Sequence, residues 1–512
     1  MSELWERSAT ELAACIARGE CSSLEAVDAH LARIETVDGM LRAVVVRRAE
    51  AARDEARACD RRRANGEPLG PLHGVPVSVK ESLDVAGTPA TYGLPSRARD
   101  VAERDDPYVT RWRAAGAVVL AKTNVPQLLI YIESDNPLYG RTNNPWNLAR
   151  SCGGSSGGEA ALVAAGGAPL GLGTDIGGSL RAPASFCGIA SFKPTQGRLD
   201  DLSRLTIFAG QRAIVSQVGP LARTVADVDL GLRVASGARA AHETPIRGLR
   251  VGVFERAGSF RASPALERAT REAAALLAER GAHVVPFEPP FVDAAIDLFY
   301  GILSADGARG AVELLGDDAR DPRVAELLAI ATKPRPVVRA IARALALAGQ
   351  RSLARVADNY GFSDTRHYWK LVEALESYRR LFALKMDAAD GGPLDLLVCP
   401  PVGLPAIPHG RSADVYTAGA YGPLFNVLGY PCGTLPFTRV RADEQLGRAK
   451  ARDRVERGAY EAERDSAGLP AGVQLVARPG RDEVALAAMY ALEEALHGRD
   501  GVPRTPVTPP FA

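Results

Sequence analysis

Several classes of protein are excluded by what this sequence lacks. No stretch of its 512 residues reaches the run of about 18 apolar residues that a membrane-spanning helix needs. The formal net charge is only +1, so composition gives no general attraction to nucleic acid. Residues 1–20 include Glu3, Glu6 and Glu11 and only a short apolar run, which is not typical of a secretory signal. We therefore expect a cytoplasmic protein that does not span a membrane and has no nucleic-acid partner.

Cysteine and histidine are also scarce and scattered. The seven cysteines include no C-x-x-C pair, so the sequence predicts neither a disulfide framework nor a zinc site. The seven histidines show no spacing that would join them to a serine or a metal, so each is expected to be structural or exposed. We predict no metal and no cofactor.

From about residue 71 the sequence is instead rich in short apolar runs, separated by glycine, proline and helical stretches. Strands that alternate with helical patterns favour an α/β fold with a largely buried mixed β-sheet and α-helices on both faces. The predicted strands are residues 74–79, 117–121, 249–254, 283–287, 394–399, 433–440 and 472–476.

The first 65 residues are predicted to be helical. Ser8-x-x-Glu11 and Ser22-x-x-Glu25 each match the capping box that opens a helix. We expect residues 1–70 to form a helical segment packed on the core. Residues 71–512 are expected to form one large domain, with a helical, cap-like insertion at about 320–385.

Two glycine-rich runs contain serines: GGSSGG at residues 153–158 and DIGGSLR at residues 175–181. Tight turns alone would explain them, because glycine permits backbone angles and close approaches that other residues do not. Phosphate binding is a weaker interpretation, because the lysine and Ser/Thr of a P-loop and the G-x-G-x-x-G spacing are absent. The first run also matches the G-x-S-x-G elbow of α/β-hydrolases, but that short pattern assigns nothing to the second run.

A third stretch, Val79-Lys80-Glu81, adds a lysine to the two serine-containing runs. A serine hydroxyl is a poor nucleophile at neutral pH, so a neighbouring group must take its proton as it attacks a carbonyl. Lys80 is the candidate base. Its ordinary pKa of about 10.4 would leave it protonated, and burial beside Val77 and Val79 would lower that pKa.

The three motifs together resemble those of the amidase signature family. The resemblance rests on GVPVSVK at residues 74–80, the run at 153–158, and residues 171–181 followed by FKPT at 192–195. Glu81 and residues 123–127, 144–146 and 152–181 are most similar to the fatty-acid amide hydrolase branch, although many family members have aspartate where this chain has Glu81. The resemblance implies the amidase-signature fold, a large twisted mixed β-sheet covered by α-helices on both faces, with residues 71–512 as the catalytic domain.

The resemblance also implies a Ser-Ser-Lys triad, with Ser179 as the nucleophile, Ser155 as a bridge often preceded by a cis peptide, and Lys80 as the base. These residues are so far apart in the sequence that only the tertiary fold can bring them together. The predicted oxyanion hole consists of backbone N–H groups from Ile176, Gly177, Gly178 and Ser179.

Three further residues are predicted to support this site. Ser156 either bonds its own turn or contacts the triad. Asp175 and Arg181 flank the proposed nucleophile and are expected to pair with the backbone or with each other, which would hold the loop.

Substrate choice is predicted from two segments. In fatty-acid amide hydrolases the segment after N-V-P-Q lines the acyl pocket, and here Leu128, Leu129, Ile130 and Tyr131 would suit a long or aromatic acyl group, although core packing explains the two leucines nearly as well. Residues 333–353 resemble a basic amphipathic helix that could lie on an anionic membrane surface, where that branch carries its membrane-facing cap. The alternatives are a solvated helix that covers the pocket and a contact in a homodimer.

Three functional classes stay open. The leading class is a serine amidase that cleaves the carbon–nitrogen bond of N-acyl amides, with fatty amides, anilides, carbamates or related esters as substrates. The second is a glutamine-hydrolysing amidotransferase subunit, which predicts a partner protein and a small polar pocket. The third is a binding module on an inactive amidase scaffold, which the presence of all three triad candidates disfavours.

Overall fold

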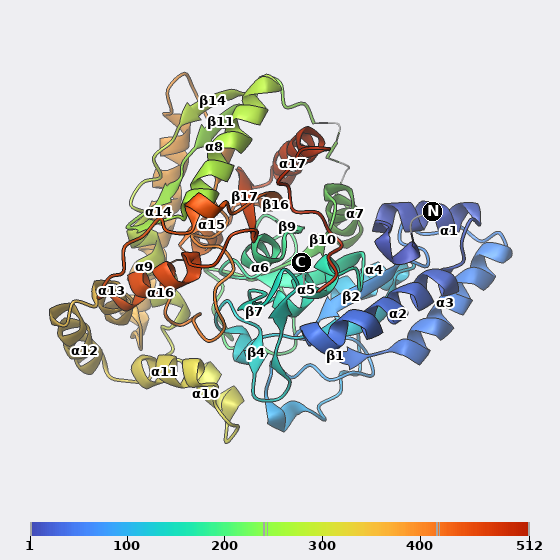
Figure 1. The fold of residues 1–512 in the computed structure, drawn as a ribbon. Coiled ribbons are helices and arrows are strands. Elements are labelled where there is room, and N and C mark those ends of the chain that lie inside the picture. Colours follow the sequence, from blue (N-terminus) through green and yellow to red (C-terminus); the bar gives the residue numbers. More distant parts are fainter. Residues whose placement is uncertain (1–2, 239–240, 243, 416–417, 419, 510–512) are drawn as a thin grey trace.

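The centre of the molecule is an eleven-stranded mixed β-sheet (Figure 1). The structure is a computed structural model, and it describes residues 3–238, 241–242, 244–415, 418 and 420–509. Across the sheet the strand order is β1 (Val44–Arg47), β3 (Val118–Thr123), β2 (Pro76–Lys80), β8 (Leu170–Asp175), β10 (Gln217–Ala222), β9 (Ala190–Lys193), β16 (Cys432–Arg439), β17 (Pro470–Ala477), β15 (Leu396–Cys399), β11 (Arg250–Val253) and β14 (His283–Pro286).

The predicted α/β fold with a mixed sheet is confirmed. Strand β2 runs parallel to both β3 and β8, whereas β10 is antiparallel to β8 and β9. The seven strands predicted from the sequence correspond to β2, β3, β11, β14, β15, β16 and β17. The three strands β8, β9 and β10, which lie between β2 and β16, were not among them.

Side chains alternate between two apolar layers along these strands, as the period of two requires. In β15, Leu396 and Val398 belong to one buried cluster, whereas Leu397 and Cys399 belong to another on the opposite face. The sheet is therefore buried on both sides, which explains why its strands are continuous apolar runs.

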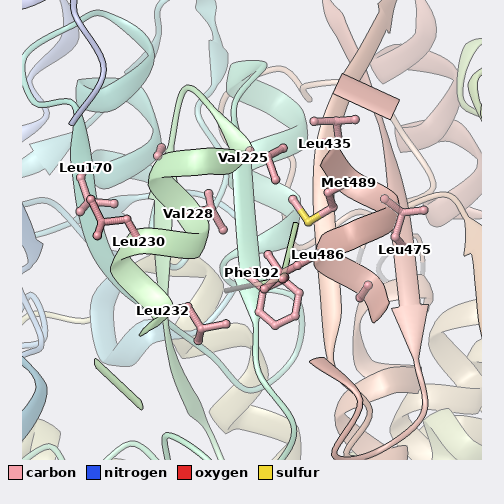
Figure 2. Packing of buried hydrophobic residues seen from close by; sticks show 14 of the residues in the cluster. Leu170, Phe192, Val225, Val228, Leu230, Leu232, Leu435, Leu475, Leu486 and Met489 are labelled. Carbon is pink, nitrogen blue, oxygen red and sulfur yellow. The ribbon is translucent and has the colours of Figure 1, made fainter. Parts of the chain in front are cut away.

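One face packs against four helices, and Figure 2 shows part of this layer. Val225, Val228 and Leu232 of one helix, with Leu486 and Met489 of another, lie against the strands that carry Leu170, Phe192, Leu435 and Leu475. The helices of this face are α4 (Pro107–Ala114), α7 (Val225–Ser236), α8 (Pro264–Glu279) and α17 (Asp482–Leu496).

The other face carries the helices that follow the two serine-containing runs. These are α5 (Gly157–Ala164) and α6 (Arg181–Cys187), both fully buried. Around them pack α2 (Ser23–Leu41), α3 (Ala49–Ala64), α9 (Val292–Leu303), α14 (Thr365–Asp387), α15 (Tyr421–Leu428) and α16 (Arg454–Glu463).

The N-terminal segment contains both predicted capping boxes. Ser8 precedes α1 (Ala9–Arg18) and Ser22 precedes α2, and each exchanges hydrogen bonds with the glutamate three residues later. The segment is not wholly helical, however. The β-branched run at 44–46 falls in strand β1, which pairs with β3 at the edge of the sheet.

Four outer helices lie on the opposite side of the molecule from α1–α3 (Figure 1). We call them the cap helices: α10 (Arg309–Leu315), α11 (Pro322–Ala331), α12 (Arg335–Leu347) and α13 (Arg351–Asn359). Outside the large sheet, the described residues form three short hairpins: β4 (Asp135–Asn136) with β5 (Gly140–Arg141), β6 (Asn143–Asn144) with β7 (Asn147–Ser151), and β12 (Arg256–Ala257) with β13 (Phe260–Arg261). Among the described residues, no helix has both the length and the apolar character needed to cross a bilayer.

Candidate active site

Strand alternation directs Lys80 towards the helices that follow the serine runs. Val77 and Val79 of β2 belong to the apolar layer of α4 and α7, so Ser78 and Lys80 lie on the opposite face of the strand. There Ser78 donates a hydrogen bond to Glu159 of α5. Lys80 is completely buried.

The Lys80 ammonium lies between two hydroxyls. Its Nζ is 2.7 Å from Ser155 Oγ and 2.7 Å from Thr174 Oγ1. Ser155 precedes α5 and follows a cis peptide bond with Gly154, as the resemblance implied. The fold thus joins two of the three predicted triad residues directly.

Burial lowers the pKa of Lys80 to about 7, because an ammonium group loses its hydration inside the protein. Four carboxylates act in the opposite direction and favour the protonated form: Asp201, Asp175, Glu159 and Glu81, in decreasing order. Since the net pKa lies near neutrality, much of Lys80 is uncharged at physiological pH and able to accept a proton.

Strand β8 approaches α5 closely because it carries glycine where a side chain would intervene. A Cβ at Gly171 would collide with the carboxylate of Glu159. That carboxylate also accepts a hydrogen bond from Thr123, at 2.5 Å. Burial raises the pKa of Glu159 to about 7. The glycine in this strand therefore places α5, and with it Ser155, against β2.

Ser179 lies in the loop between β8 and α6, which Asp175 and Arg181 hold from within. Their side chains form a buried ion pair at 2.9 Å, and Arg181 also donates to Gln474 Oε1 at 2.8 Å and to Asn426 Oδ1 at 2.6 Å. Burial alone would raise the pKa of Asp175, but the Arg181 guanidinium holds it well below its usual range. The charged form of the pair is thereby fixed.

The Asp175 carboxylate already accepts a hydrogen bond from one of the four N–H groups predicted to form the oxyanion hole. Gly178 has φ of +109° and donates its N–H to Asp175 Oδ1 at 2.9 Å. Within the described part of the chain, the N–H groups of Ile176, Gly177 and Ser179 donate to no protein acceptor. These three remain free to bind a carbonyl oxygen.

The loops of the two serines are tied together through Ser156. Its N–H donates to the carbonyl oxygen of Ser179 at 3.2 Å, and its hydroxyl donates to the carbonyl oxygen of Thr174 at 3.2 Å. Ser156 thus bonds the neighbouring strand rather than its own turn. No hydrogen bond between described residues joins the hydroxyls of Ser155 and Ser179, but both open onto one cavity.

That cavity has a volume of about 200 Å³ and a mostly apolar wall. Residues 128–131, predicted to line the acyl pocket, all contribute, and Leu128, Leu129 and Tyr131 do so from backbone with positive φ. Leu327, Leu328 and Ala331 of α11 close another side, so the cap helices form part of the wall.

Sequence reasoning missed several residues that build this site. Thr174 holds the amine of Lys80, and Asn426 and Gln474 hold Arg181. Phe299 of α9 lines the cavity and lies so close to Gly177 that a Cβ there would be 3.0 Å from its ring. The sequence signals for them are weak: a hydroxyl at the end of a glycine-rich strand, and single amides inside apolar runs.

Metal-binding side chains do not gather near this site. The described residues contain no group of three or more His, Cys, Asp or Glu side chains that could hold a metal ion. Glu133 and His409 approach each other at 3.2 Å, and Glu133 also pairs with Arg323 of α11 at 2.7 Å. This cluster fastens the cap to the segment that precedes β4.

Comparison with known proteins identifies relatives over most of the chain. The family model described as Amidase matches residues 25–486. The chain is 33% identical to fatty-acid amide hydrolase 1 of Sus scrofa, over 86% of this chain and 78% of that protein. It is 40% identical to a glutamyl-tRNA(Gln) amidotransferase subunit of Roseiflexus castenholzii, over 60% of this chain and 65% of that protein. A solved structure described as fatty acid amide hydrolase aligns with a TM-score of 0.82 and 26% identity, over 97% of this chain and 86% of that chain.

Proposed function

This chain belongs to the amidase signature family, whose members are hydrolases that act on carbon–nitrogen bonds. From that premise we propose that it cleaves N-acyl amides with an apolar acyl group, and that the reaction passes through an acyl-enzyme on Ser179. The observation that carries the proposal is the buried contact of 2.7 Å between Lys80 Nζ and Ser155 Oγ, at the wall of an apolar cavity that also contains Ser179.

In this reaction the neutral amine of Lys80 takes the proton of Ser155, which takes the proton of Ser179 as Ser179 Oγ attacks the amide carbonyl. The oxyanion is bound by the N–H groups of Ile176, Gly177 and Ser179. Ammonium Lys80 then returns its proton through Ser155 to the leaving nitrogen, and the carbon–nitrogen bond breaks. Water attacks the acyl-enzyme by the same relay and releases the acid.

The hydrogen bonds around Arg181 have an indirect role in this reaction, because they fix the loop that carries Ser179. By binding Gly178 N–H and Leu180 N–H, Asp175 fixes the backbone on both sides of Ser179, so that the remaining N–H groups point the same way when the substrate arrives. Such preorganisation is worth about 10²- to 10³-fold in rate for each oxyanion donor.

The proposal is tested with a fluorophosphonate probe, which reacts with activated serines, followed by peptide mass spectrometry. We expect the adduct on Ser179 and none in the Ser179→Ala variant. A screen of acyl amides, with a carbamate, an anilide and an ester of the same acyl group, then ranks the leaving groups. An adduct on Ser155 with an active Ser179→Ala variant would contradict the assignment and favour an elbow nucleophile.

A second candidate function is favoured by the similarity to amidotransferase subunits, which is as strong as the similarity to fatty-acid amide hydrolases. In that function the chain would release ammonia from glutamine for a partner protein. A small polar substrate gains little from the apolar wall formed by residues 128–131 and α11, which is why we place it second. Ammonia release from glutamine that exceeds hydrolysis of every acyl amide would reverse this order.

We also propose that residues 333–353 contact a membrane surface. Helix α12 buries only Val338 and Ala342, and it exposes Arg339 and Arg343 together with Leu347. Co-sedimentation with anionic liposomes at low salt is expected, and the double variant Arg339→Glu/Arg343→Glu should abolish it. A chain that stays in the supernatant but elutes as a dimer would instead favour a homodimer contact.

A further inference from the structure

The cavity next to Ser179 carries an unbalanced charge. Two of its lining residues are carboxylates, Asp201 and Asp306, and none of the described lining residues is lysine, arginine or histidine. An apolar site with negative charge and no lining cation differs from what a simple fatty amide requires.

The two carboxylates differ in what they already bind. Asp306 is exposed and uses both oxygens within its own loop, because Oδ1 accepts the N–H of Ala308 at 2.8 Å and Oδ2 that of Gly310 at 2.9 Å. In its contacts with the described residues, Asp201 uses Oδ1 alone, which accepts the N–H and the hydroxyl of Ser203 at 3.0 and 2.5 Å. Among the described residues no cation pairs with Asp201, so Oδ2 is available to a ligand.

The neighbouring aspartate, Asp200, differs from Asp201 because its carboxylate oxygens accept hydrogen bonds from several groups of the protein. Asp200 accepts from Arg212 at 3.0 Å, from Gln217 Nε2 at 2.7 Å and from the N–H of Gly197 at 2.9 Å. The part of the chain that the structure describes gives Asp201 no such set of partners, although it is half-buried and lines the cavity.

The backbone holds Asp201 firmly. Residues 199–201 extend the sheet beside β10, with Val218 N–H donating to Leu199 O at 2.7 Å and Asp201 N–H donating to Ser216 O at 2.8 Å. Between them, Asp200 is bridged to Gln217, which in turn pairs with Asp175 at the end of β8. Asp201 therefore has a fixed position relative to the strand end that begins the Ser179 loop.

We propose that Asp201 is a specificity-determining residue that pairs with a positively charged group of the substrate, so that the preferred substrates are amides with both an apolar part and an ammonium or guanidinium group. The inference rests on the proposed function and names its substrate class. A neutral apolar amide that fills the cavity removes water from the Asp201 carboxylate without forming a compensating interaction. A substrate cation replaces that water with an ion pair.

The electrostatics of Lys80 fit this assignment. Of the four carboxylates that raise the pKa of Lys80 against the effect of burial, Asp201 acts most strongly, ahead of Asp175, Glu159 and Glu81. A substrate cation next to Asp201 offsets its charge and lowers the pKa of Lys80. Binding of the preferred substrate thereby favours the neutral amine that the reaction needs.

The test compares amides that differ only in charge. In the first pair the charge lies on the leaving amine: N-(4-aminobutyl)octanamide is charged and N-pentyloctanamide is neutral. In the second pair the charge lies on the acyl group: the N-propyl amide of 8-aminooctanoate is charged and the N-propyl amide of nonanoate is neutral. In at least one pair we expect the charged amide to have a kcat/KM about 10- to 100-fold higher than its neutral counterpart. Asp201→Asn should bring that ratio close to one and hydrolyse the neutral amide faster than the wild type does. The matched control Asp200→Asn makes the same charge change in the same loop and should keep the wild-type ratio.

A binding measurement separates this inference from the proposed function. In the Ser179→Ala variant, calorimetry measures the Kd of each amide without turnover, and the charged member of the preferred pair should bind more tightly only while Asp201 is present. Equal Kd values within both pairs, or a preference that survives Asp201→Asn, would overturn the role of Asp201 even if amide hydrolysis is observed. If fluorophosphonate does not label Ser179 and no amide is hydrolysed, the proposed function is overturned. The Kd values of the charged and neutral amides then still test whether Asp201 binds the substrate cation.

Discussion

The polar network of the site and the cap helices that face it are held in opposite ways. The polar network comprises Lys80, Ser155, Thr174, Asp175 and Arg181, all at most 2% exposed and joined by hydrogen bonds and an ion pair. The cap helices expose large apolar residues: Leu347 of α12 is 92% exposed. A small apolar cluster that includes Leu128, Val324 and Leu328 packs the cap against the core.

From this difference we expect the polar network to determine the rate of the chemical steps and the cap helices to determine which substrate is preferred. Proton transfer and oxyanion binding depend on the orientation of the reacting groups, which a buried and hydrogen-bonded network fixes. The cap contributes wall residues to the cavity, whereas the hydrogen bonds of Lys80 and Ser155 to described residues involve none from the cap. We therefore expect variants of the network to reduce turnover of all amides alike, and variants of the cap to change which amide is preferred.

The largest effect is expected from Lys80→Ala. Loss of the general base should lower kcat/KM by about 10²- to 10⁴-fold at neutral pH. Because the amine is active only when deprotonated, wild-type kcat/KM should fall as pH drops below about 7, the pKa of Lys80, and the variant should lack this limb. Rate measurements from pH 5 to 9 test both statements.

Lys122 offers a matched control for this variant. It is also buried, its pKa is also lowered by burial, to about 8, and it lies opposite Val79 in the neighbouring strand, but its ammonium binds the carbonyl oxygen of Pro89. Lys122→Met should retain the limb near pH 7. If it loses the limb and Lys80→Ala keeps it, the base has been misassigned.

The next largest effect is expected from Arg181→Met, which leaves Asp175 charged and unpaired in the core. Breaking such a buried pair typically destabilises a protein by about 3–5 kcal/mol, so the urea midpoint should fall sharply. The double variant Asp175→Asn/Arg181→Met removes both charges and should lose less stability than the single variant. Equal losses would mean that the pair is not what stabilises the loop.

Four of these five network residues, Lys80, Ser155, Asp175 and Arg181, were among the residues predicted from the sequence, whereas Thr174 was not. Lysine, serine and glycine in fixed motifs predict the chemistry, and the period of two in β2 explains why Lys80 and Ser78 share a face. Strand β8 was missed for the opposite reason, because its glycines make it look like a loop. Only the contact with Glu159 shows that glycine is required there.

Residues that act across long separations could not be predicted. Asn426 and Gln474 reach Arg181 from α15 and β17, and no local pattern marks an amide as the partner of a distant guanidinium. The prediction of helix over the first 65 residues rests on the capping boxes and overlooks the short β-branched run of the edge strand β1, which lies between two helices. The sequence predicts a helical insertion at about 320–385, but which of its residues reach the cavity depends on how α11 packs, not on its composition.

A smaller effect is expected where the cap meets the core, at Arg323. Its guanidinium pairs with Glu133 at 2.7 Å and with Asp135 at 3.0 Å, and it also contacts Asp321. In Arg323→Gln these charge-assisted contacts weaken by about 1.5 kcal/mol, so KM for long acyl amides should rise roughly tenfold while kcat changes little. An equal loss in kcat for short and long amides would place Arg323 with the polar network instead.

The smallest effect is expected from Leu328→Ala. Leu328 is buried in α11 and lines the cavity, so its truncation enlarges the apolar wall without touching Lys80, Ser155 or Ser179. The ratio of kcat/KM for a longer over a shorter acyl chain should rise about fourfold for each added methylene group that the enlarged wall buries, since one buried methylene is worth about 0.8 kcal/mol. Leu347→Ala, on the exposed face of α12, should leave the ratio as in the wild type. If Leu328→Ala lowers turnover of both chains equally, the cap takes part in the chemistry and the division between the two regions does not hold.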